Sequence, residues 1–129
     1  MTAAKRLLFL RPALVLAGAL TAACATNPVT GQRQLALVSE AQELSMGREA
    51  AQDVQASIGL VDNAPMQAYV SRIGLDLAGG SERPKLPWAF AVVDDPTPNA
   101  FALPGGFIFV TRGLMTLLDS EAELASVLW

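Results

Sequence analysis

The sequence predicts an α+β fold in which N-terminal helices are followed by a small antiparallel or mixed sheet with a hairpin. Apolar residues recur at spacings of three and four through residues 39–78, which is the helical period. Through residues 88–111 the pattern changes to short runs rich in Ala, Phe and Val, broken by Pro and Gly. We expect the helices to lie on one side of this sheet.

Residues 1–23 have the pattern of a bacterial secretory signal, with basic residues followed by the apolar run ALVLAGAL and then by small residues. The run is too short for an ordinary membrane-spanning helix, which needs roughly 20 residues. The segment Leu20–Cys24 resembles a lipobox, the site at which lipoproteins are cleaved and acylated. We therefore expect lipidation at Cys24. A plain signal peptide or an uncleaved signal anchor is the alternative.

Composition excludes several classes of function. Removal of residues 1–23 would take away three of the nine basic residues and none of the twelve acidic ones, leaving a net charge of −6. An acidic chain without a basic patch is not expected to bind nucleic acid. The chain also contains no histidine, so it has neither an imidazole base nor an imidazole metal ligand.

Residues 24–38 are expected to form a tether that leads to a domain of residues 39–129. The domain opens with a helix over residues 39–58, because Ser39 and Gln42 form a capping box. Gly47 lies on the apolar face of this helix and is predicted to mark a close contact with another helix.

A second helix is predicted over residues 65–78, capped by Asp62 or Asn63 and ended by a Gly pair. Its apolar face carries four residues, namely Tyr69, Val70, Ile73 and Leu77. A strand is predicted over residues 88–94, and a hairpin over residues 100–111 that turns at Pro104, Gly105 and Gly106.

The final segment, residues 118–129, has the start signals of a helix. Ser120 and Glu123 are spaced as a capping box, and acidic residues occupy the positive end of the helix dipole. We expect this helix to continue beyond Trp129, because no Gly, basic last turn or Pro marks a stop.

The remaining carboxylates have simpler interpretations than an active site. Asp94 and Asp95 are adjacent, so on a strand they would point to opposite faces and would not share a site. Helix capping accounts for Glu121 and Glu123. Glu43 and Glu49 are expected on the solvated surface of the first helix.

Three stretches together resemble a known family: NPVTGQRQLALVSEAQELSMGREAA, NAFALPGGFIFVTRGLM and SEAELASVL. They resemble the zinc metallopeptidases of the HtpX and CAAX-prenyl-endopeptidase type, most closely the periplasmic branch of the β-barrel-assembly-enhancing protease. The resemblance implies a zinc-dependent metalloendopeptidase of the bacterial cell envelope that hydrolyses polypeptides, possible substrates being misfolded outer-membrane proteins.

In that family a helix that begins like SEAELASVL continues into Gly and then His-Glu-x-x-His. Two histidines one turn apart bind one Zn²⁺, and the glutamate between them activates the bound water. Trp129 stands where the family has the glycine, so the chain is expected to stop just before its zinc ligands. The resemblance thus implies that these 129 residues hold no zinc and no catalytic residue.

The resemblance also implies where substrate would bind. In such proteases a strand before the active-site helix receives the substrate as an added strand. The residues implied for this role are Asn99, Ala100, Phe101 and Ala102 along the edge, with Pro104, Gly105 and Gly106 fixing the turn. The alternative is that the Phe residues belong to the core and that the glycines only shape a hairpin.

Two functions from different classes remain open. One is the envelope metalloendopeptidase, facing the periplasm and anchored by lipid on Cys24, with the outer membrane favoured because Ala25 follows the cysteine. The other is a short lipoprotein that binds unfolded envelope proteins without cutting them.

Overall fold

The computed structural model describes residues 24–26, 33–35 and 38–129 of the chain. The predicted signal segment, residues 1–23, lies outside the described residues. Within the predicted tether, β1 (Cys24–Thr26) pairs antiparallel with β2 (Arg33–Leu35). Among the described residues, no helix has both the length and the hydropathy needed to cross a membrane.

Two long helices open the domain, as predicted. α1 (Glu40–Ser57) begins at Ser39, whose hydroxyl accepts from the Gln42 N–H while the Gln42 side chain accepts from the Ser39 N–H. α2 (Ala64–Gly79) begins at Asn63, whose side chain accepts from the Met66 N–H. The predicted capping box of α1 is confirmed, and Asn63 rather than Asp62 caps α2.

A three-stranded mixed sheet follows, so the predicted α+β class is confirmed. The strands are β3 (Ala89–Val93), β4 (Ala100–Leu103) and β5 (Phe107–Thr111), in the order β3-β5-β4. β4 and β5 form the predicted antiparallel hairpin, whereas β3 and β5 are parallel. The single-turn helix α3 (Arg112–Met115) and then α4 (Glu121–Leu128) follow the sheet.

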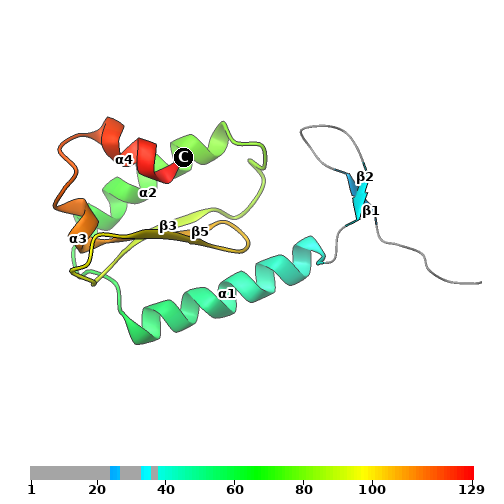
Figure 1. Ribbon diagram of the computed structural model, residues 1–129, viewed down its shortest axis with the longest axis horizontal. Helices are drawn as coiled ribbons and strands as arrows, with labels where there is room; N and C mark the ends of the chain where they lie inside the picture. The colour runs from blue at the N-terminus through cyan, green and yellow to red at the C-terminus, as the bar shows by residue number, and fades with distance from the viewer. Residues whose placement is uncertain (1–23, 27–32, 36–37) are drawn as a thin grey trace, which may run out of the picture.

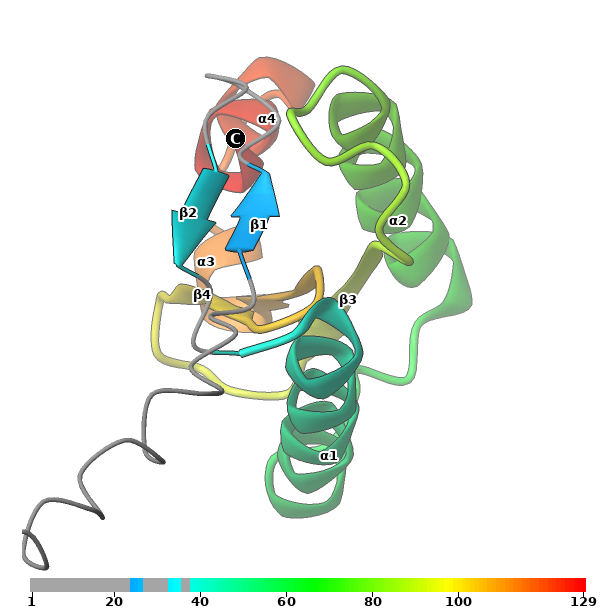
Figure 2. The ribbon, with the colours of Figure 1, turned by 90° about the vertical axis from the view of Figure 1, so that its right-hand side faces the viewer.

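The helices cover both faces of the sheet, so the expectation that they lie on one side is wrong. Figure 1 shows α2 and α4 above the sheet and α1 below it, and Figure 2 shows the same layers after a quarter turn. Strand alternation explains the two layers, because successive side chains point to opposite faces. Phe90 and Val92 pack in the cluster that contains Leu124 of α4, whereas Val93 packs with Ala51 of α1.

The apolar face of α2 is rotated slightly from the one predicted. Val70 and Ile73 are buried as expected, but Tyr69 is 37% exposed. Gly74 is buried in its place, with the ring of Phe90 so close that a Cβ on Gly74 would lie 2.3 Å from it. The helix therefore approaches β3 through a glycine and not through an aromatic side chain.

The hairpin turn rests directly on α1. A Cβ built on Gly47 would lie 1.7 Å from the Pro104 carbonyl oxygen, so only glycine permits this approach. Gly47 was predicted to contact another helix; its neighbour is instead the β4–β5 turn. Gly105 and Gly106 have φ of +82° and +91°, a conformation that other L-residues rarely adopt.

One carboxylate links this turn to two further segments. Glu43 of α1 accepts a hydrogen bond from the Gly105 N–H at 3.1 Å. The same carboxylate pairs with both terminal nitrogens of Arg83, at 2.9 and 3.1 Å. The Arg83 guanidinium, together with the Gly105 N–H, lowers the pKa of Glu43 below its ordinary value of 4.5, although partial burial opposes this. The expectation that Glu43 is only solvated helix surface is therefore wrong.

Replacement of Gly47 tests the close approach of α1 to the turn. Gly47→Ala is expected to lower the free energy of unfolding by about 1–3 kcal/mol, because the new methyl group overlaps the Pro104 carbonyl. Gly79→Ala is the matched control, since nothing lies within 4 Å of a Cβ there. Urea denaturation should show Gly79→Ala equal to or more stable than the parent chain. Equal stability of Gly47→Ala and the parent would contradict the contact.

Acid titration tests the Glu43 pair. Because the pKa of Glu43 is lowered on folding, its stabilisation is complete above 4.5 and is lost as the pH falls through the lower folded value. Glu43→Gln should reduce the free energy of unfolding by about 1 kcal/mol at neutral pH, for a partly exposed pair. The deficit should disappear in acid, and Glu49→Gln, which changes an exposed carboxylate of the same helix, is the control at neutral pH. A deficit independent of pH would contradict the assignment.

Candidate functional site

The outer edge of β4 is the feature of the sheet that bears most directly on binding. β4 pairs only with β5 among the described strands, with Phe101 opposite Phe109 and Ala102 opposite Ile108. The Thr111 N–H donates to the Asn99 carbonyl at 2.9 Å, which marks these two residues as a hydrogen-bonded pair. Because such pairs alternate along an antiparallel ladder, the N–H and C=O groups of Ala100 and Ala102 point away from β5.

The predicted edge residues therefore divide into two kinds. Ala100 and Ala102 present their backbone groups to the open edge. Asn99 and Phe101 direct theirs toward β5; the Asn99 N–H also donates to the Thr111 hydroxyl at 2.9 Å. Asn99 thus anchors the start of β4 and does not itself offer a peptide-pairing group.

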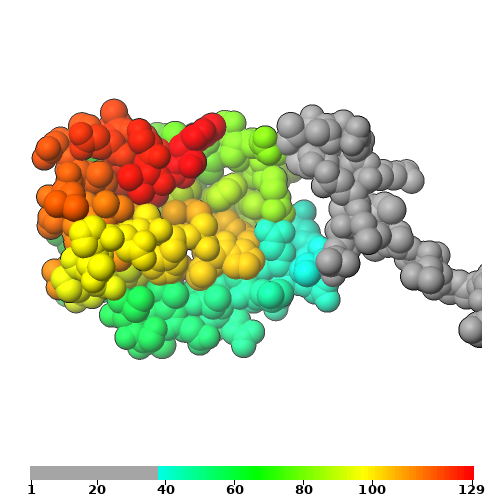
Figure 3. All heavy atoms as spheres, in the orientation of Figure 1, coloured from blue at the N-terminus to red at the C-terminus, as the bar shows by residue number. Residues whose placement is uncertain are grey.

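The side chains of β4 form two different surfaces beside this edge. Ala100 packs with the cluster that contains Leu124 of α4, and the next side chain on that face is the exposed Ala102. On the other face Phe101 stacks on Phe109, with ring centroids 5.4 Å apart, and Leu103 packs beside them. Figure 3 shows the yellow segment that contains β4 uncovered between α4 and α1. An added strand would meet small side chains on the α4 face and apolar ones on the α1 face.

The opposite edge of the sheet is covered at Val92 and Val93. The Val92 N–H donates to the Gln67 side-chain oxygen at 2.8 Å, and the Gln67 amide donates to the Val92 carbonyl at 2.9 Å. The Val61 N–H donates to the same carbonyl at 3.0 Å, and Leu60 forms a β-bridge with Val93. Gln67 of α2 therefore pairs with β3 much as a neighbouring strand would. In the described part of the chain, β4 is the one edge strand whose successive outward N–H and C=O groups have no such hydrogen-bonding partner.

α4 lies on the same face as Ala100 and is held by a cap and one buried side chain. The Ser120 hydroxyl accepts from the Glu123 N–H at 3.2 Å, as predicted. The Glu123 carboxylate accepts from the Asp119 N–H at 2.7 Å, one residue before the predicted partner. Leu124 is 1% exposed and fixes α4 against α2 and the sheet.

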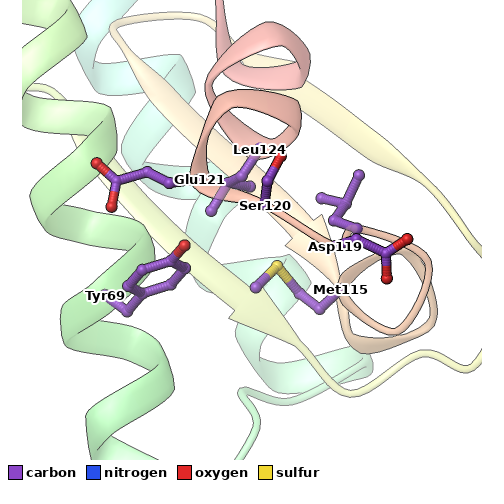
Figure 4. Close-up of a pocket in the computed structure, with 7 residues that line it drawn as sticks. Tyr69, Met115, Asp119, Ser120, Glu121 and Leu124 are labelled. Carbon is purple, nitrogen blue, oxygen red and sulfur yellow. The ribbon is translucent and has the colours of Figure 1, made fainter.

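The carboxylates near α4 do not form an acid–base pair. A hollow of about 180 Å³ lies at the start of the helix, and Figure 4 shows the Asp119 and Glu121 carboxylates pointing in different directions around it. Glu121 pairs with Arg72 of α2 at 2.9 Å, so capping alone does not account for this residue. The Arg72 guanidinium lowers the pKa of Glu121.

Asp94 and Asp95 make separate interactions, as predicted. Asp94 pairs with Arg112, and the Asp95 side chain accepts from the Thr97 N–H at 2.7 Å within the loop. In residues 24–26, 33–35 and 38–129, no group of three or more His, Cys, Asp or Glu is placed to hold a metal ion. The side chains described here therefore do not fit a zinc site.

Sequence reasoning missed Gln67, Glu43 and Arg83. Gln67 carried a signal, because it lies three residues before the buried Val70 and so on the core-facing side of α2. A polar residue at such a position must find a partner. Glu43 and Arg83 carried no comparable signal, since they are 40 residues apart and each suits a solvated surface.

Comparison with known proteins places these elements in a family. The family model described as peptidase family M48 matches residues 64–128, half of the chain. The chain is 36% identical over 104 residues to the mitochondrial metalloendopeptidase OMA1 of Schizosaccharomyces pombe, covering 78% of this chain and 31% of that protein.

Bacterial relatives give a similar result. The β-barrel assembly-enhancing protease of Escherichia coli is 28% identical over 103 residues, which cover 80% of this chain and 21% of that protein. A protease HtpX homolog of Dictyoglomus thermophilum is 44% identical over 59 residues, which cover 43% of this chain and 18% of that protein. The chain thus spans a third or less of the length of these relatives, and it belongs to peptidase family M48.

Proposed function

We propose that residues 39–129 form the peptide-binding part of a zinc-dependent metalloendopeptidase of the bacterial cell envelope. The observation that carries this proposal is the open edge of β4 beside α4 in a chain of family M48. An extended substrate would add to β4 as a fourth strand, with its backbone bonded to Ala100 and Ala102. Phe101 and Leu103 would contact alternate substrate side chains on the α1 face. The Pro104–Gly106 turn would fix the position of the C-terminal end of β4.

Zinc is the cofactor that the family implies, and in family members it supplies an activated water for peptide hydrolysis. These 129 residues contain no histidine, and the described ones offer no cluster that fits the metal. We therefore expect the chain to bind extended polypeptide without cleaving it. Its own residues would position the substrate backbone beside α4.

The place of action is part of the same proposal. The lipobox-like segment Leu20–Cys24 supports a lipid anchor on Cys24, with the domain facing the periplasm and the outer membrane favoured. A relative named for β-barrel assembly supports misfolded outer-membrane proteins as the substrate class. Another relative is named as mitochondrial, so the support for a lipid anchor comes from this chain's own N-terminal sequence alone.

The second candidate function is a binding lipoprotein without peptidase activity, and the open edge of β4 supports it equally. Both candidates use the β4 edge, so peptide binding alone does not separate them. The gene sequence beyond the codon for Trp129 does. A His-Glu-x-x-His motif there, in any frame, supports the peptidase, whereas its absence supports the binding protein.

Blocking the β4 edge tests the proposed site. The probe is a fluorescent peptide of alternating valine and threonine flanked by lysines, called here the strand probe. Ala102→Pro removes the outward N–H of β4 but leaves the ladder to β5 intact, as proline does on edge strands. Fluorescence anisotropy should show binding of the strand probe to the parent chain and loss of binding in Ala102→Pro, with the probe recovered uncut.

Ala102→Thr is the matched control for this experiment, because it alters the same exposed side chain and keeps the N–H. It should bind the strand probe as the parent does. Equal affinity of Ala102→Pro and Ala102→Thr, with both variants folded by circular dichroism, would rule out pairing at this edge.

Mass spectrometry of the protein isolated from bacterial envelopes tests the anchor. The expected product has lost residues 1–23 and carries acyl chains on Cys24. Cys24→Ser should leave the segment uncleaved at this position, and the product should carry no acyl chains. An intact N-terminus on the wild-type protein would exclude lipidation.

A further inference from the structure

Glu43 occupies an unusual place for a residue in the first turn of a helix. Its carboxylate contacts the β4–β5 turn through Gly105 and the loop before β3 through Arg83, while its own backbone belongs to α1. Three segments that are distant in sequence therefore meet at one side chain. Figure 1 shows the turn between β4 and β5 lying over the first half of α1.

The contact depends on the close approach described above. Gly47, one helical turn after Glu43, has no side chain and lets the Pro104 carbonyl sit against α1. A Cβ on Gly105 would lie 3.1 Å from the Cα of Leu44, so the turn is fitted between these two positions of the helix. The Gly105 N–H donates to the Glu43 carboxylate at 3.1 Å, which joins the turn to α1 at this point.

Arg83 extends this link to the far end of α4. A hollow of about 410 Å³ is lined by residues that include Arg83, Trp88, Phe90, Leu128 and Trp129. The Arg83 carbonyl also accepts from the Trp88 indole N–H at 2.9 Å, which fixes the loop on which Arg83 lies. The segment joined to Glu43 through Arg83 is thus the one that borders the end of α4.

We infer that Glu43 is a positioning residue, which sets where the peptide-binding edge of β4 lies relative to α4. β4 has only four residues, and Leu103 leads directly into the turn that Glu43 holds. A bidentate ion pair defines both distance and orientation, so the link from the turn to the Arg83 loop fixes a geometry and not merely a contact. This inference rests on the proposed binding of peptide at β4.

Three variants of the full chain test the inference with the strand probe. Glu43→Gln removes the ion pair and the charged acceptor of Gly105. Arg83→Met removes the pair but leaves the Glu43 carboxylate on the turn, so it serves if Glu43→Gln fails to fold. Glu49→Gln makes the same charge change on the exposed surface of α1 and is the matched control.

The expected result is that Glu43→Gln weakens probe binding about tenfold. Arg83→Met should weaken it as well, and Glu49→Gln should bind as the parent does. The measurement is made at a temperature where circular dichroism shows every variant folded. In the parent, affinity should also fall with acidification as Glu43 is protonated, and this fall should be missing in Glu43→Gln. The charged groups that face Glu43 are Arg83 and, beyond it, Glu40.

The possible failures are distinct. If the parent chain does not bind the strand probe, the proposed function and this inference fall together. If the parent binds and Ala102→Pro does not, while Glu43→Gln and Arg83→Met both match the parent, only the positioning role is overturned.

Discussion

The structure depends most on how the two edges of a small sheet satisfy their backbone hydrogen bonds. A three-stranded sheet has two edges, and an unpaired edge is a template for another strand. At β3 the side chain of Gln67 and the backbone of Val61 occupy the outward groups of Val92. At β4 the corresponding groups of Ala100 and Ala102 carry no such cover in the described residues. This asymmetry is the reason that we propose peptide pairing at β4.

The layers on the two faces support that edge in different ways. α2 and α4 bury the larger apolar cluster, in which Leu124 ties α4 to the sheet. α1 covers the other face through a smaller cluster and reaches the hairpin turn by means of Gly47 and Glu43. α1 therefore holds the turn that ends β4, and the unpaired edge of β4 is left open beside α4.

Local signals predicted much of this arrangement. Ser39 with Gln42, Asn63 and Ser120 start helices because their side chains bond to backbone groups within three residues. The hairpin was predicted by a different local signal, because Pro and Gly suit the positions of a tight turn at 104–106. The parallel pairing of β3 with β5 had no local signal, because the strands are joined through β4 and not by a turn of their own. The side of the sheet on which α1 packs likewise depends on contacts far apart in sequence.

The candidate site was predictable only in part. The resemblance implied the segment Asn99–Ala102, but the ladder register decides which of these residues face outward. Glu43 escaped prediction because its partner Gly105 is 62 residues away and a first-turn glutamate already suits the helix dipole. A role that comes from tertiary contact leaves little trace in a single sequence.

Amide hydrogen exchange, measured with and without the strand probe, tests the central claim most directly. In the free chain the amides of Ala100 and Ala102 should exchange rapidly, whereas those of Phe101 and Leu103 should be protected by β5. Binding of the probe should protect Ala100 and Ala102 and leave the other two unchanged. Protection of Ala100 and Ala102 in the free chain, or rapid exchange there with the probe bound, would contradict an open peptide-binding edge at β4.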